Sequence, residues 1–136
     1  AEFGAAMLEH RQSSGGQECA LRQDLRNPSK DQELDAVLFD KVDGVAYAVI
    51  GSMKTCAKDT SQVHKLMKDI SLVKERASED RYSGYAAFKN HTLVPAFMAE
   101  HIEAKVEKEV VGLCKLKGVL LFGRTTGGIQ LRPNND

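Results

Sequence analysis

Two short apolar runs on either side of a tight turn form the clearest local pattern in the chain. Residues 37–42 and 45–50 are rich in β-branched and aromatic side chains, and they flank Asp43-Gly44. Such runs favour β-strands, and Asp-Gly suits a type I′ turn because both of its central positions need a positive φ. We therefore expect a β-hairpin over residues 37–50.

Two longer segments have apolar residues at helical spacing. Residues 63–73 carry apolar side chains three and four positions apart, behind possible capping residues at 59–61, which predicts an amphipathic helix ending near Asp80. A second long helix is predicted from Pro95 to Gly112 by a four-residue repeat of apolar side chains: Met98, Ile102, Val106 and Val110.

The remaining elements are predicted to be short. Residues 17–27 are expected to form a helix that stops before Pro28, because the residue preceding a proline avoids helical angles. Residues 82–94 read as one or two short strands. At the end of the chain, strand-like residues 113–122 and 129–132 predict a second hairpin, with its turn at residues 123–128.

Together these elements predict an α+β fold. An antiparallel sheet is built from the two β-hairpins, and two long helices and one short helix pack on one of its faces. Residues 17–132 are expected to form a single globular domain.

Both ends of the chain are predicted to lie outside this domain. The first six residues include Glu2-Phe3, the dipeptide that an EcoRI site encodes, and are interpreted as a cloning scar. Residues 7–16 end in Ser-Ser-Gly-Gly, which is typical of a flexible arm. Residues 133–136 are expected to form a flexible tail.

Composition and charge narrow the class of protein. The 136 residues are 42% hydrophobic and 28% charged, and 19 Lys and Arg balance 19 Asp and Glu. No overall charge therefore attracts nucleic acid or an anionic membrane. Three widely spaced cysteines, no signal-peptide pattern and no run of 18 apolar residues predict a cytoplasmic protein without membrane association.

No motif predicts a metal or a cofactor. Residues 31–35 contain three acids at the spacing of a calcium loop, but Ala36 and Val42 stand where that loop needs Gly and Glu. No His or Cys pair has zinc-ligand spacing. Cys56, before a predicted helix whose dipole could lower a thiol pKa, is the candidate reactive thiol. The simpler interpretation is a small packing residue at that junction.

A local excess of positive charge is predicted in the C-terminal hairpin. No acid lies between residues 113 and 132, and the basic residues of this segment are Lys115, Lys117, Arg124 and Arg132. Such a basic hairpin could contact nucleic-acid phosphates, although no known RNA- or DNA-binding signature accompanies it.

Three functions remain open at this point. The first is a non-enzymatic protein-interaction or assembly module that associates with itself, because a small sheet leaves unpaired edges. The alternative is an RNA-binding or other nucleic-acid-binding protein that uses the basic hairpin. The second alternative is a small enzyme whose site is assembled from distant segments.

Overall fold

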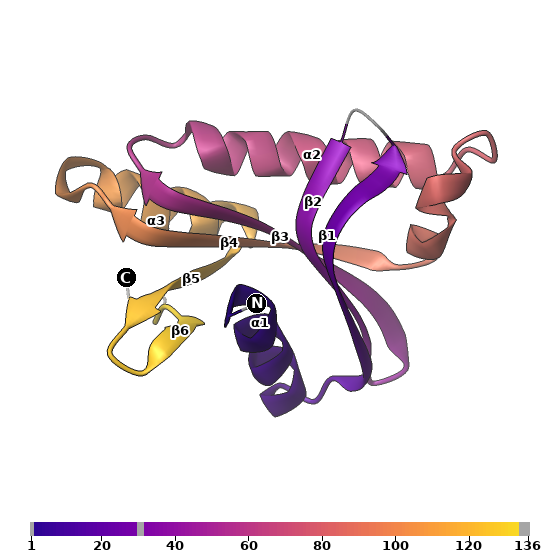
Figure 1. Ribbon diagram of the computed structural model, residues 1–136, viewed down its shortest axis with the longest axis horizontal. Helices are drawn as coiled ribbons and strands as arrows, with labels where there is room; N and C mark the ends of the chain where they lie inside the picture. Colours follow the sequence, from indigo (N-terminus) through magenta and orange to yellow (C-terminus); the bar gives the residue numbers. More distant parts are fainter. Residues whose placement is uncertain (1, 30–31, 134–136) are drawn as a thin grey trace.

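The chain folds around one curved sheet. The computed structural model describes residues 2–29 and 32–133. Six strands lie in the order β1-β2-β3-β4-β5-β6, and the sheet curls into a half-barrel (Figure 1). The strands are β1 (Gln17–Ser29), β2 (Gln32–Val42), β3 (Val45–Ala57), β4 (Thr92–Ile102), β5 (Leu120–Thr125) and β6 (Gly128–Leu131).

The sheet is mixed, so the predicted sheet is wrong although the α+β class is right. Antiparallel pairs join β1 to β2, β2 to β3 and β5 to β6, whereas β3 pairs with β4 and β4 with β5 in parallel. A parallel pair needs a long crossover connection, and helices α2 (Ser61–Ala77) and α3 (Glu107–Lys117) supply the two crossovers. The predicted sheet contained only hairpins, which give antiparallel pairs, so it did not include the two parallel pairs of β4.

The two strongest local signals are confirmed. β2 and β3 form the expected hairpin, with φ of 51° at Asp43 and 81° at Gly44, the positive values that a type I′ turn requires. Helix α2 occupies the predicted amphipathic segment and buries its apolar stripe: Val63, Leu66, Ile70, Val73 and Ala77.

Two predicted helices are wholly or partly strands. Residues 17–27 belong to β1, and the first part of the predicted second helix, residues 95–102, belongs to β4, whereas its last part, residues 107–112, begins α3. A four-residue repeat is also a multiple of the two-residue period of a strand, so it fits either element. In the structure the two members in β4 join different cores, Met98 the one beside α1 and Ile102 the one beside α2. Pro95 itself lies inside a central strand, opposite Ile50 of β3.

Two further boundaries differ from prediction. The short 3-10 helix η1 (Ser83–Phe88) occupies the segment expected to hold strands before β4 begins. The C-terminal hairpin is present as β5 and β6, but residues 113–117 form the last part of α3. A second short 3-10 helix, η2 (Ala104–Val106), precedes α3.

Helices cover both faces of the sheet. Helices α2, η1 and α3 pack on one face around a core that includes Ile50, Tyr85 and Phe97. Helix α1 (Glu2–Ser13) packs on the opposite face (Figure 1). There Phe3 and Met7 belong to a buried cluster with Phe122. Residues 2–13, expected to be a scar and a flexible arm, are thus helical in the structure. Residues 134–136 of the expected tail lie outside the described residues.

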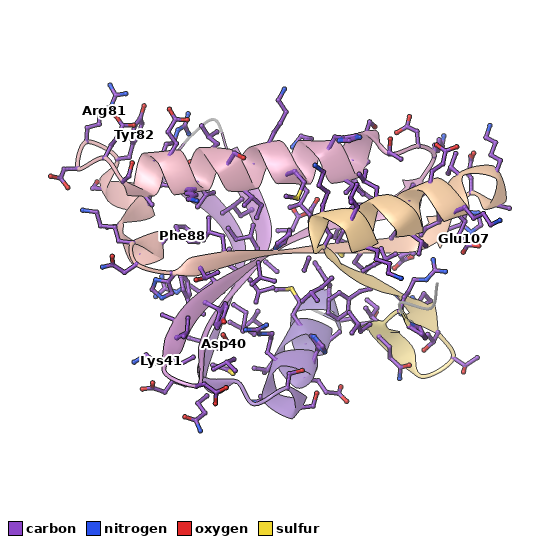
Figure 2. All side chains as sticks on the ribbon, turned by 180° about the vertical axis from the view of Figure 1, so that it is seen from behind. Asp40, Lys41, Arg81, Tyr82, Phe88 and Glu107 are labelled. Carbon is purple, nitrogen blue, oxygen red and sulfur yellow. The ribbon has the colours of Figure 1, made fainter. Side chains whose placement is uncertain are left out.

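Helix α1 is also anchored by a buried ion pair. The Arg11 guanidinium donates to the Asp40 carboxylate, with Nε 2.7 Å from Oδ2, and it also lies over the Tyr47 ring. Asp40 belongs to β2, which lies beside α1 (Figure 2). The pKa of Arg11 is raised, chiefly by its hydrogen bond to Asp40.

Within the described ranges, no helix is long and apolar enough to cross a membrane.

Candidate functional site

The four basic residues expected in one hairpin lie on different elements. Lys115 and Lys117 are on α3, Arg124 is on β5 and Arg132 follows β6. The Arg132 guanidinium Nη2 lies 2.9 Å from the Glu107 carboxylate.

Acidic residues from other elements already hold Arg124. Its guanidinium donates to Glu100 on β4 at 2.6 Å and to Glu2 on α1 at 3.0 Å. These hydrogen bonds raise the pKa of Arg124, the one to Glu100 most strongly. A phosphate would therefore have to compete with two carboxylates for this side chain.

Cys56 lies near the end of β3 rather than at a helix start. It is half-buried and pairs in the parallel register with His101 of β4, while α2 begins only at Ser61. Desolvation raises the pKa of the Cys19 thiol, and burial raises that of Cys114 to about 11. No group of three or more metal-ligating side chains occurs among the described residues.

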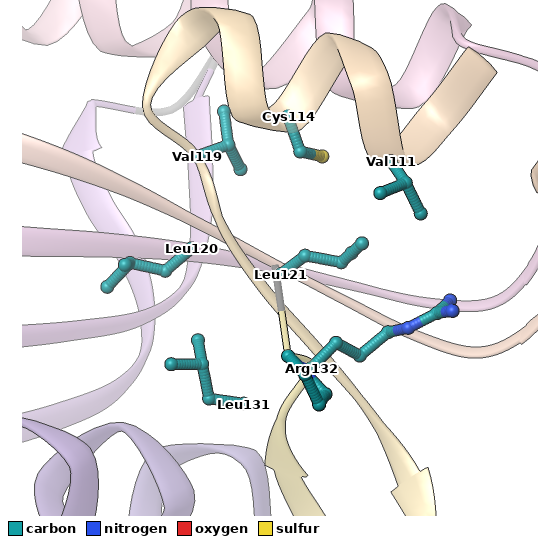
Figure 3. Close-up of a pocket in the computed structure, with 8 residues that line it drawn as sticks. Val111, Cys114, Val119, Leu120, Leu121, Leu131 and Arg132 are labelled. Atoms are coloured by element: carbon teal, nitrogen blue, oxygen red, sulfur yellow. The ribbon is translucent and has the colours of Figure 1, made fainter. Parts of the chain in front are cut away.

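A pocket beside Cys114 is small and mainly apolar. It lies between α3 and the β5–β6 hairpin and has a volume of about 80 Å³ (Figure 3). Binding pockets for organic ligands usually enclose roughly 300–1,000 Å³. This cavity lies far below that range, and the only charged side chain in its described lining is that of Arg132, which already faces Glu107.

A second, more polar pocket forms where the sheet forks. Pairing between β2 and β3 ends at Ala36 and Gly51. Beyond this point the start of β2 pairs with β1, whereas the rest of β3 pairs with β4. The β1–β2 hairpin thus turns toward α2 while β3 continues in another direction (Figure 1).

Hydrogen bonds to α2 and η1 hold the diverging hairpin in place. Gln32, at the start of β2, is buried; its Nε2 donates to the backbone oxygen of Asp69 at 3.2 Å. The Tyr85 hydroxyl donates to Gln32 Oε1 at 2.6 Å and accepts a hydrogen bond from Arg76 at 3.0 Å. Because these groups fix the hairpin against α2, the fork is a stable feature of the fold.

The space inside the fork, which we call the fork pocket, has a volume of about 180 Å³. β2, β3 and α2 all contribute residues to it: Leu34, Asp35, Ile50, Gly51, Ser52, Met53, Lys54, Lys65, Leu66 and Asp69. Ser52 and Lys54 are two residues apart on β3, so their side chains lie on the same face as Ile50, the face that α2 covers.

Charged groups of both signs line the fork pocket. The Asp35 carboxylate accepts a hydrogen bond of 2.8 Å from the backbone N–H of Met53. The Lys65 ammonium lies 3.2 Å from Asp69. Lys54 is half-buried, and within the described part of the chain its ammonium has no hydrogen bond or ion pair. The lining thus holds two carboxylates, two ammonium groups and the Ser52 hydroxyl, and of the two ammonium groups that of Lys54 has no acidic partner among the described residues.

Sequence reasoning missed this site almost entirely. Asp35 was weighed only as part of a calcium loop, and Ser52 and Lys54 were not singled out. The sequence does contain one indication of the site. After residues 48–51, which are buried in β3, polar side chains stand at alternate positions, 52 and 54.

Comparisons with family models, with curated proteins and with solved structures find no match for this chain.

Proposed function

We propose that this chain binds nucleic acid and hydrolyses a backbone phosphodiester held in the fork pocket. The observation that supports the proposal is that Asp35 and Lys54, whose ammonium has no partner among the described residues, line the same polar pocket. This proposal keeps the nucleic-acid alternative drawn from the sequence but moves the site from the C-terminal hairpin to the fork.

A phosphodiester fits the fork pocket by charge and by hydrogen bonding. It carries one negative charge and two non-bridging oxygens, which Lys54 can neutralise and the Ser52 hydroxyl can contact. Because the Lys54 ammonium has no acidic partner among the described residues, an anionic ligand can pair with it without displacing a carboxylate. Lys65, which shares its charge with Asp69, adds a second cation at the same opening.

Asp35 supplies the group that hydrolysis needs beside the phosphate. Mg²⁺ is commonly bound by one or two carboxylates together with water and substrate phosphate oxygens, so a single aspartate suits it. The ion would polarise the phosphate and lower the pKa of an attacking water. In the proposed step the water would give up one proton to solvent as its oxygen bonds to phosphorus, while the bond to one sugar oxygen would break and that oxygen would take up a proton from solvent. Lys54 stabilises the charge that builds on the phosphate oxygens.

The proposal is tested by cleavage of labelled DNA and RNA in the presence of Mg²⁺ or Mn²⁺. Asp35→Asn keeps an oxygen that can accept the Met53 N–H but removes the negative charge. We expect it to reduce cleavage at least about 100-fold, the scale of losing one group that stabilises the transition state. Lys54→Gln should weaken both binding and cleavage. Asp59→Asn, an exposed acid outside the pocket, is the matched control.

Two results would overturn this proposal. The hydrolysis is wrong if the unmodified chain cleaves neither DNA nor RNA with either metal ion. The phosphate site is wrong if Lys54→Gln binds nucleic acid as tightly as the unmodified chain.

Self-association remains a second proposal, supported by one surface observation. Leu116 on α3 is 77% exposed, the most exposed large hydrophobic side chain among the described residues. If copies of the chain meet through this helix, light scattering should show a mass that rises with concentration, and Leu116→Lys should abolish the rise. A monomer at every concentration would exclude self-association.

A further inference from the structure

We infer that the shallow groove along α2 is a second part of the nucleic-acid site, which takes the backbone phosphates next to the one in the fork pocket. This inference rests on the proposed function. It adds a binding surface, the direction in which the strand leaves the pocket, and the way in which the strand is recognised.

The groove is continuous with the fork pocket. Lys65 and Asp69 line both spaces, so the two spaces adjoin along this ion pair, and a strand that leaves the fork pocket on the α2 side reaches the groove by passing over it. The groove has a volume of about 800 Å³, and it lies along α2 with one residue contributed by α3. Its lining is His64, Lys65, Met67, Lys68, Asp69, Ser71, Leu72, Glu75 and Lys117.

The charges in the groove fit a phosphate backbone. Lys68 on α2 and Lys117 at the end of α3 are exposed, and in the described structure neither side chain has a hydrogen bond or ion pair. The only lysine of the groove with an acidic partner there is Lys65, which is paired with Asp69. Two free ammonium groups beyond the fork pocket can neutralise two further phosphates of one strand.

The same lining argues against recognition of unstacked bases. The described lining of the fork pocket and of the groove contains no Phe or Tyr, and its single aromatic ring is the imidazole of His64, too few for a row of stacked bases. Proteins that bind splayed single strands usually stack the bases on aromatic side chains. We therefore expect contacts to the backbone alone, and an affinity that depends on salt much more than on sequence.

The test uses the full chain with Lys68 and Lys117 both changed to Ala, and fluorescence anisotropy with labelled 20-base-pair duplexes of two unrelated sequences. Each phosphate contact releases bound counterion, so losing two should lower the slope of log K against log salt by about 1.8. At 50 mM salt this corresponds to affinity weaker by about 10-fold per contact.

The matched control is the double variant Lys74→Ala and Lys108→Ala. It also removes one exposed lysine from α2 and one from α3, but neither residue lines the groove. Both double variants keep the same net charge, so a difference between them reports position rather than total charge. Their unfolding curves should match that of the unmodified chain, because exposed charges contribute little to stability.

The outcomes separate the two proposals. A reduced slope only in the Lys68/Lys117 variant, equal for both sequences, supports the groove. Equal slopes in the two double variants overturn the groove and leave the fork pocket standing if Lys54→Gln still weakens binding. A large preference for one sequence overturns backbone recognition. Failure of the unmodified chain to bind any nucleic acid overturns both proposals.

Discussion

Phe3→Ala tests whether α1 is an integral part of the fold. Phe3 is only 3% exposed and meets Phe122 edge to face, with ring centroids 5.5 Å apart. Truncating a buried Phe to Ala costs about 3–5 kcal/mol, and an edge-to-face aromatic pair contributes roughly 0.5–1.5 kcal/mol of that cost. The first turn of a helix relaxes more easily than its centre, so we expect about 3 kcal/mol.

Urea unfolding followed by circular dichroism measures this change. In a chain of this length the same loss should lower Tm by about 10 °C. Glu9→Ala is the control, because it alters an exposed residue of the same helix and should change stability by less than about 0.5 kcal/mol. If Phe3→Ala is no more destabilising than Glu9→Ala, α1 does not dock on the sheet and residues 2–13 behave as a flexible arm.

Three shorter predictions concern the turn, one imidazole and the thiols. Gly44→Val should cost about 1 kcal/mol or more in urea unfolding, because a β-branched residue is strained at the φ of 81° found there. Burial, and to a smaller extent Arg11, lowers the pKa of His10 from 6.5, so the unfolded chain binds its proton more readily; stability should fall as the pH drops below about 6.5, and His10→Gln should weaken that dependence. Burial raises the pKa of the Cys114 thiol to about 11, so mass spectrometry after iodoacetamide treatment at pH 8 should find half-exposed Cys56 alkylated well before Cys114.

The parts of the fold that could be predicted are those specified by neighbouring residues. Asp43-Gly44 fixes a hairpin because the turn chemistry is contained in two positions, and α2 follows from its own apolar stripe. The spacing of the apolar residues in β4 does not distinguish a helix from a strand, because a four-residue repeat fits the period of either element. This segment is a strand because it pairs in parallel with β3 on one side and β5 on the other, and both partners are distant in the sequence.

The fork pocket could not be read from the sequence for the same reason. Asp35 lies in β2 and Lys54 lies beyond the hairpin turn in β3. They share a pocket only because the strands separate after Ala36 and Gly51, and a sequence does not show where a ladder of hydrogen bonds stops. The C-terminal segment looked like a free positive patch in the sequence. In the structure Arg124 and Arg132 are paired with acidic residues of other elements, which the sequence does not show.

Gly51 connects α1 to the fork pocket through the sheet. A Cβ at this position would lie 2.7 Å from Phe3 Cε2 and 3.0 Å from Met7 Sδ, so Gly51→Ala must displace these two side chains and, where they cannot move far enough, α1 or β3 with them. Overpacking of this kind costs about 1–3 kcal/mol. Phe3→Leu removes the ring that the new methyl group meets, and the double variant should therefore be more stable than the sum of the two single changes predicts. Energies additive within about 0.5 kcal/mol would contradict this contact.

Since Ser52 follows Gly51 directly, a shift of β3 would also weaken phosphate binding, whereas a shift of α1 alone would lower stability and leave binding unchanged. Comparing the free energy of unfolding with the affinity for nucleic acid in Gly51→Ala therefore shows whether α1 or β3 moves. It also shows whether the packing of α1 fixes the position of the strand that carries Lys54.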